Sequence, residues 1–294
     1  MNSIPKTPWS RLELVGEYVT QTPLRIGGTE SNGQGGLALD TNGLPWIPAS
    51  TFRGVLRATV ESLLRSLDSE ARATLYHLQV SGANGLPLPI VRRVSLCCDS
   101  VDKSAEDAHY QGCLTDAIVA SWQADPLVRP HLDRVIVGCT CLACRVFGAS
   151  WIAGRVRVND LPLIPDSWDR SFVTRGGVTI RRDTGTLLEN SAYTREALPA
   201  GVRFRFRLFV ENATFAEQGL ILLGLRAFQK GMIGLGADQS RGFGRGVLEM
   251  DWWNCRTIDA ANLIDAFLSS APTLLTEKDA DARIAAFSDM INAE

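Results

Sequence analysis

The chain has 294 residues, of which 45% are hydrophobic and 21% charged, and its formal net charge is −2 at pH 7. This balance fits one large or two small globular domains and excludes a protein that is basic throughout. No apolar run reaches the roughly 18–20 residues of a membrane helix. Residues 1–9 also lack a hydrophobic signal segment, so we expect a cytoplasmic protein without membrane contact.

Arginine carries almost all of the positive charge, because only four of the 30 basic residues are lysine. Acidic residues collect at 99–107 and beyond Asp259, which leaves arginine-rich segments between them. A basic face on a neutral protein is compatible with a nucleic-acid partner. A GC-rich genome would give the same preference for arginine, so the bias alone does not decide the function.

The first predicted strand covers residues 11–20, where apolar and polar residues alternate as in a strand with one buried face. The pattern continues to the glycine pair at 27–28. A polar loop follows at 29–36; it has no apolar residues to pack and is expected to project. Residues 37–40 are interpreted as a short second strand.

A long amphipathic helix is predicted from Ser50 to Arg65. Ser50 is a good N-cap, and apolar residues recur at helical spacing along one side. Arg53 and Arg57 lie four residues apart in the first two turns, beside N–H groups without partners inside the helix. Such a helix start can bind phosphate, although a solvated helix face would show the same spacing.

The next segment is less regular and is interpreted as an insertion at about 68–150. Residues 69–80 are predicted to continue as helix and residues 91–96 to form an edge strand. A further helix is predicted at 116–122, and the prolines that follow it interrupt regular structure.

Cys139, Cys141 and Cys144 follow a C-x-C-x-x-C pattern. Zn²⁺ prefers four ligands in a tetrahedron, and tight turns of this type supply two or three of them. The odd total of seven cysteines argues against a disulfide framework. Free buried thiols and redox chemistry stay open as alternatives. The candidates for the fourth ligand are, in order of preference, Cys113, His109 and Cys98.

Residues 154–160 form another alternating strand. Residues 171–186 are basic, contain glycine and favour β-structure without a continuous apolar face, so they are expected to form an extended hairpin or arm. Residues 202–210 predict a strand with three arginines on one face and apolar residues on the other.

An amphipathic helix at 218–230 leads into a glycine-rich loop at 234–246, and residues 247–253 form the closing strand in this interpretation. Cys255, after a pair of tryptophans, is expected to be a core residue. Two surface helices are predicted in the tail, at 258–268 and 278–292.

The loop at 234–246 has the composition of a phosphate-binding segment, with five glycines among its 13 residues. Glycine lets the backbone approach a ligand closely. Arg241 and Arg245 supply planar, charged groups suited to phosphate. Phe243 lies between them and offers a ring on which a base could stack. A glycine-rich stretch between a helix and a strand is also often no more than a turn.

Five motifs occur in the order found in one known family. They are Pro-Trp-Ile-Pro-Ala-Ser-Thr-Phe-Arg-Gly-Val-Leu-Arg ending at Arg57, Cys-Leu-Ala-Cys-Arg-Val-Phe-Gly ending at Gly148, Arg-Arg-Asp-Thr-Gly-Thr at 181–186, Leu-Pro-Ala-Gly at 198–201, and the loop at 234–246. Together they resemble the RAMP superfamily of CRISPR-associated proteins, in particular the repeated backbone subunit of type III effector complexes.

The resemblance implies an α+β fold with a ferredoxin-like, or RNA-recognition-motif-like, β-α-β-β-α-β core over residues 10–250. It implies a zinc-bearing insertion at about 68–150, a thumb-like β-hairpin at about 171–190 and a helical tail at 255–294. It also implies head-to-tail stacking with copies of itself or related RAMP subunits along a CRISPR RNA, and contact with target RNA. Stacked subunits can follow RNA length through backbone contacts and stacking.

The motifs and the resemblance together give the candidate site residues. The candidate RNA-binding residues are Ser50, Arg53, Arg57, Arg181, Arg182, Gly236, Arg241, Phe243 and Arg245, of which Arg181 and Arg182 lie in the implied thumb. The predicted ligands of a structural zinc are Cys113, Cys139, Cys141 and Cys144.

One departure bears on catalysis. Target-cleaving members hold an aspartate in the loop after the glycine pair, whereas Gln34 or Gly35 stands at that place here. Glutamine cannot take a proton or hold a divalent cation as a carboxylate does. Glu30 and Asp40 lie nearby, and a shifted register would restore an acid. We expect a subunit that binds RNA and cleaves target RNA poorly or not at all, and we assign no catalytic residue.

Three classes of function are therefore considered. The first is an RNA-binding backbone subunit of a CRISPR ribonucleoprotein in antiviral defence. The second is a metal-dependent endoribonuclease in the same complex, which needs a working acid between residues 29 and 40. The third is an unrelated zinc-stabilised enzyme that binds nucleotide through the glycine-rich loop and lacks salt-dependent RNA affinity.

Overall fold

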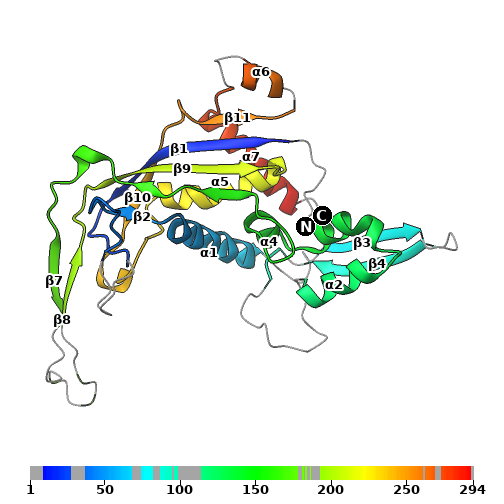
Figure 1. Cartoon of the computed structure of the whole chain (residues 1–294), viewed down its shortest axis with the longest axis horizontal. Coiled ribbons are helices and arrows are strands. Elements are labelled where there is room, and N and C mark those ends of the chain that lie inside the picture. The colour runs from blue at the N-terminus through cyan, green and yellow to red at the C-terminus, as the bar shows by residue number, and fades with distance from the viewer. Residues whose placement is uncertain are drawn as a thin grey trace.

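The computed structural model describes residues 9–27, 37–67, 74–81, 87–94, 96–98, 114–177, 181, 183, 186, 193–260, 262–268 and 273–292. For residues 74–81, 87–94 and Tyr193 it describes the backbone alone. Figure 1 shows a central sheet with helices packed beneath it and two hairpins at opposite ends of the view. Within the described ranges, no helix is both long enough and apolar enough to cross a membrane.

The central sheet is antiparallel, in the order β10 (Gly246–Met250), β1 (Arg11–Thr20), β9 (Arg203–Glu211) and β5 (Val156–Val158). A fifth strand, β11 (Arg256–Ile258), pairs with the first residues of β1 on the edge that β10 also uses. The alternation read from the sequence at 11–20 and 202–210 is confirmed, because every second side chain of β1 and β9 is buried.

Two helices, α1 (Ala49–Leu67) and α5 (Phe215–Gln229), lie against one face of the sheet (Figure 1). Phe52 of α1 is fully buried, and its ring centroid lies 5.0 Å from that of Phe206 on β9 and 4.8 Å from that of Phe228 on α5. Burying one such side chain stabilises a fold by about 1.5–3 kcal/mol. Phe52 therefore joins both helices to the sheet.

A buried ion group fixes the start of α5. Thr214 and Glu217 form a capping box, in which each side chain accepts a hydrogen bond from the other residue's backbone N–H. The Glu217 side chain is 2% exposed and also pairs with Arg155, while Arg145 lies 3.4 Å from its second oxygen. Because Arg155 precedes β5 and Arg145 lies on α4 (Leu142–Phe147), Glu217 links three elements.

The tail packs on the core through α7 (Glu277–Asn292). A Cβ atom added to Gly219 of α5 would lie 1.9 Å from the carbonyl oxygen of Arg283 on α7, so the two helices touch where glycine leaves no side chain. The predicted helix at 278–292 is confirmed, whereas residues 258–268 hold the end of β11 and a shorter helix, α6 (Leu263–Leu268). Cys255 is fully buried, as expected, and burial raises its pKa to about 11.

The predicted insertion holds a hairpin and helices. The helix predicted at 69–80 is wrong: residues 74–81 form β3 (Thr74–Ser81), which pairs antiparallel with β4 (Pro87–Val94). The prediction followed local pattern, whereas the strand is fixed by pairing with a segment further along the chain. Helices α2 (Asp116–Ala124) and α3 (Leu132–Cys139) then build a second apolar cluster.

A second hairpin joins β7 (Val173–Gly177) to β8 (Tyr193–Ala197) and extends away from the sheet, at the left of Figure 1. It rejoins the core through a bridge between Leu24 and Leu198. Residues 37–40 make isolated bridges rather than the short strand expected. The remaining short elements are β2 (Trp46–Ile47), β6 (Leu161–Pro162), η2 (Arg129–His131), η3 (Pro165–Ser167) and η4 (Gln239–Arg241).

Candidate metal centre and nucleic-acid interface

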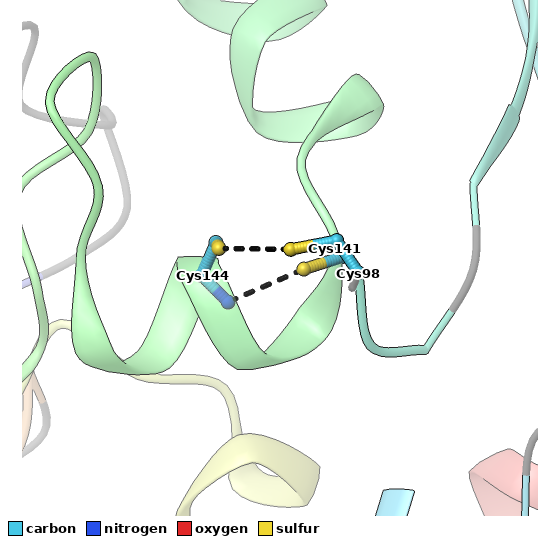
Figure 2. A group of neighbouring side chains, drawn as sticks. All are labelled: Cys98, Cys141 and Cys144. Carbon is cyan, nitrogen blue, oxygen red and sulfur yellow. Dashed lines mark hydrogen bonds between the residues drawn. The ribbon is translucent and has the colours of Figure 1, made fainter. Parts of the chain in front are cut away.

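Three cysteine sulfurs meet at the start of α4. Cys141 is the N-cap of this helix, and its Sγ accepts a hydrogen bond of 3.4 Å from the N–H of Cys144. Cys98 comes from the segment 96–98 and lies next to Cys141, with its Sγ 3.6 Å from the Sγ of Cys144 (Figure 2). All three side chains are buried, and their ligand atoms lie within 4.8 Å of one another.

These distances fit thiolates that share a metal ion. A disulfide holds its sulfurs about 2.05 Å apart, so 3.6 Å between Cys98 and Cys144 is too long for one. Zinc–sulfur bonds of about 2.3 Å in a tetrahedron place the sulfurs about 3.8 Å apart. The group is therefore compatible with a structural metal.

The described group differs from the ligand set predicted from the sequence. Cys141 and Cys144 belong to it, but Cys139 packs into the second apolar cluster at the end of α3. The third sulfur is that of Cys98, which the sequence offered only as a later alternative. Cys113 and His109 lie outside the described residues.

Arg53 and Arg57 reach the cysteine turn from α1. The Arg53 guanidinium donates to the carbonyl of Phe147 at the end of α4. Arg57 donates to the carbonyl of Gly148 at 3.3 Å and to the Glu61 carboxylate at 2.7 Å. Both arginines thus satisfy acceptors where α4 ends, an arrangement that the spacing along α1 does not reveal.

The sulfur cluster and the arginines also share an electrostatic environment. Arg57 Nη2 lies 3.9 Å from the Sγ of Cys144. Burial acts to lower the pKa of Arg57, but the hydrogen bond to Glu61 and the charges of Glu61, Cys144 and Cys98 outweigh it, and its pKa is raised. For Arg53, burial and then the charge of Arg57 lower the pKa. Arg57 is therefore placed to stabilise thiolates.

The glycine-rich loop folds tightly against the segment that follows β1. The Ala237 N–H donates to the carbonyl of Arg25, and the Gly244 N–H donates to the carbonyl of Pro23, both at 2.8 Å. Gly236 has φ of 81°, and a Cβ there would lie 2.2 Å from the Arg25 carbonyl. Glycine at this position is therefore required for the close approach.

Asp238 lies at the centre of this loop in the left-handed conformation, with φ of 62°. Its side chain is 8% exposed and pairs with three arginines from three segments. Arg195 of β8 donates to Oδ1, as does Arg241 at 2.9 Å, while Arg25 lies 3.7 Å from Oδ2. Among the described residues, Oδ2 accepts no hydrogen bond.

Phe243 and Arg245 of the loop differ in their exposure to solvent. Phe243 is 3% exposed, and the Arg175 guanidinium lies 4.9 Å from its ring centroid, so this ring packs inside the loop rather than opening to solvent. The Arg245 side chain is exposed and makes no ion pair with the described residues. The loop thus presents arginines rather than an aromatic surface.

The remaining predicted RNA-binding residues are scattered or outside the description. Ser50 is exposed at the start of α1, and Arg181 is exposed beyond β7. Arg182 lies outside the described residues. Arg53 and Arg57 contact carbonyls at the end of α4, whereas Arg25, Arg195 and Arg241 contact Asp238. The structure therefore shows two separate arginine groups, one at the cysteine turn and one at Asp238.

Three residues of the group around Asp238 were not predicted from the sequence: Arg25, Arg195 and Asp238 itself. Asp238 could have been recognised as a partner for the loop arginines, because it is the only acidic residue among positions 234–246. The two arginines lie in segments far apart in the chain and carry no common pattern; only the fold brings them together.

The open face of the sheet carries a third arginine group. Arg203 bonds Glu17 at 2.7 Å and Glu249 at 3.1 Å, and Arg207 bonds Glu13 at 2.6 Å. A groove of about 590 Å³ is lined by Arg203 and Arg205 among others. Arg203 and Arg207 are matched by carboxylates, whereas Arg205 between them is exposed. Because three arginines gather around the single carboxylate of Asp238, the glycine-rich loop is the better candidate for a polyanion.

Comparison with known families identifies the chain. A family model, described as the RAMP superfamily, matches residues 17–248. The chain belongs to the RAMP superfamily. Membership associates it with CRISPR systems and RNA binding. A search of curated proteins found no match.

The match spans the features described above. It begins within β1 and ends within β10. The matched residues therefore include β5 and β9 of the central sheet, the cysteine turn, the β7–β8 hairpin and the glycine-rich loop. Of the acids near the loop after β1 in this RAMP chain, Asp40 is exposed, and its carboxylate accepts the N–H groups of Asn42 at 2.8 Å and Leu44 at 2.9 Å. Glu30, Gln34 and Gly35 lie outside the described residues.

Proposed function

We propose that the chain is a CRISPR RNA-binding backbone subunit of a type III effector ribonucleoprotein in antiviral defence. It would stack with copies of itself or related RAMP subunits in the cytoplasm and position target RNA beside the guide. The observation that carries this proposal is the meeting of Arg25, Arg195 and Arg241 at Asp238, beside the exposed Arg245. Arginine offers bidentate, permanently charged donors to phosphate.

The proposed core is ferredoxin-like. Support comes from the order of the elements β1, α1, β5, β9, α5 and β10, which is strand, helix, strand, strand, helix, strand when the added pieces are left aside. The strand order β10-β1-β9-β5 gives further support, because it lets both crossover helices cover the same face. We propose an insertion at about 68–150, a thumb at about 171–190 and a tail at 255–294 as additions to that core.

We further propose that the cysteine group holds a structural zinc ion. Cys98, Cys141 and Cys144 would be three of the ligands, and Cys113 is the preferred fourth. The buried sulfurs and their spacing support this, as does the cation of Arg57 beside them. The ion would hold the Cys98 segment on α4, which Arg53 and Glu217 fix to the core.

Binding without cleavage is the better-supported activity. The Asp40 carboxylate already closes its own turn with Asn42 and Leu44, which disfavours it as a base or metal ligand. Guide-directed cleavage of labelled target RNA, measured with the unmodified chain and with Asp40→Ala, tests this directly. Cleavage that disappears in Asp40→Ala would overturn this part of the proposal.

The stacking proposal has a direct test in images of the purified protein mixed with a CRISPR-repeat RNA. We expect rows of regularly spaced subunits whose length grows with RNA length. Single compact particles at every RNA length would contradict a backbone role. Separate particles that still bind nucleotide would favour the nucleotide-binding enzyme instead.

A further inference from the structure

We propose that Asp238 is a positioning residue, which sets the RNA-binding geometry of the loop by holding arginines from separate segments in one arrangement. This inference rests on the proposed RNA-binding function. An acid inside a basic RNA surface would ordinarily weaken binding, because it repels phosphate. The burial of Asp238 and its three partners favour the opposite role.

The backbone of the loop holds the Asp238 carboxylate in place. Asp238 comes from a loop whose backbone is pinned to Arg25 by the Ala237 N–H at 2.8 Å. Its left-handed backbone, which Asp and Asn tolerate better than most residues, turns the side chain inward, where it is 8% exposed. Its position is thus fixed from both the main chain and the side chain.

The Asp238 carboxylate connects the hairpin to the glycine-rich loop. Arg195 lies on β8 of the long hairpin, and Arg241 lies in the loop itself, only three residues from Asp238. Both donate to the same oxygen, Oδ1. The hairpin and the loop are therefore tied at one atom, while the bridge from Leu24 to Leu198 holds the base of the hairpin.

A second interaction between the same two elements supports this interpretation. Arg175 of β7 lies over the ring of Phe243, two residues beyond Arg241, at 4.9 Å from the ring centroid. Both strands of the hairpin thus place an arginine on the loop. Rigid placement of donors reduces the entropy lost when a ligand binds. Asp238 would accordingly favour binding although its charge opposes it.

The test compares two variants that remove the same charge. Asp238→Asn keeps the shape and tolerates the left-handed backbone, whereas Glu196→Gln removes an exposed acid one residue from Arg195 on the same strand. We expect Asp238→Asn to weaken binding of a single-stranded CRISPR-repeat RNA about tenfold or more, since buried charge partners are worth that much. Glu196→Gln should bind as the unmodified chain or slightly more tightly.

Salt dependence gives a readout that simple loss of folded protein would not change. If an arginine released by Asp238→Asn no longer neutralises its phosphate, the plot of log affinity against log salt becomes less steep, by about 0.7 in slope for each such phosphate. Asp238→Asn that binds as tightly as Glu196→Gln, with an unchanged slope, would overturn the proposal. If the unmodified chain shows no RNA affinity, it is the proposed function that fails instead.

Variants at Arg195 test the same role from the partner's side, so the proposal does not depend on Asp238→Asn alone. If Asp238 acts through Arg195, the effects of Arg195→Gln and Asp238→Asn overlap, and the double variant binds no more weakly than the weaker single one. Additive effects would contradict the positioning role. Arg195→Lys, which keeps the charge but not the planar fork, should also weaken binding; unchanged affinity in this variant counts against the proposal.

Discussion

Cys98 and Cys144 hold their sulfur atoms 3.6 Å apart, although 46 residues separate them in the chain. Together with Cys141 they form a buried group in which the backbone N–H of Cys144 already donates to one sulfur. The spacing of these sulfurs is compatible with thiolates around one structural metal ion. In the proposed zinc site, Arg57 would be an additional cation beside the sulfur of Cys144.

Metal content tests the cysteine group. The purified chain should carry about one zinc ion, and Cys144→Ser should lose it, because three sulfurs can no longer surround the ion. Cys139→Ala is the matched control from the same motif and should keep its metal, since Cys139 packs into the second apolar cluster. Elemental analysis after dialysis measures both. Loss of zinc in Cys139→Ala and retention in Cys144→Ser would reverse the assignment.

The free energy of unfolding distinguishes a structural role of Arg53 at the cysteine turn from a role in RNA binding. Arg53→Gln should lower the free energy of unfolding by about 1–3 kcal/mol, because the Phe147 carbonyl loses its donor. Arg65→Gln, at the exposed end of the same helix, should change it by less than about 0.5 kcal/mol. Urea unfolding compares the two. If Arg53→Gln unfolds like the unmodified chain yet loses RNA affinity, Arg53 serves RNA rather than the cysteine turn.

Two glycine substitutions test how the tail docks. Gly219→Ala should destabilise the chain and release α7, because its Cβ would meet the Arg283 carbonyl at 1.9 Å. Gly54→Ala, on the exposed side of α1, meets nothing within 4 Å and should stabilise the chain by about 0.5–1 kcal/mol. Thermal unfolding with limited proteolysis of the tail follows both effects. An intact tail in Gly219→Ala would mean that the docking of α7 does not depend on this close approach.

The main sheet could be predicted from the sequence because its alternation is strong. Residues 11–20 and 202–210 bury every second side chain, a pattern that local sequence carries in full. The segment at 69–80 failed because its strand depends on pairing with residues 87–94 rather than on its own pattern.

The candidate site was predicted less completely, for a related reason. Arginines in the α1 and loop motifs were recognised as phosphate-binding types, but their partners are set by tertiary structure. Arg53 faces a carbonyl of α4 and Arg241 faces Asp238, and neither partner follows from spacing. The cysteine pattern gave two of the three grouped sulfurs, while Cys98 came from a segment with no ligand spacing of its own.

In the proposed function, the arginines of the glycine-rich loop bind a ribose-phosphate strand. The most direct measurement is the affinity for a single-stranded CRISPR-repeat RNA at several salt concentrations, for the unmodified chain and for Arg241→Gln/Arg245→Gln. We predict that log affinity falls linearly with log salt, and that the double variant binds more weakly, with a slope smaller by about 0.7 for each phosphate that it no longer neutralises. Affinity that does not respond to salt, or a double variant that binds as the unmodified chain does, would contradict the claim.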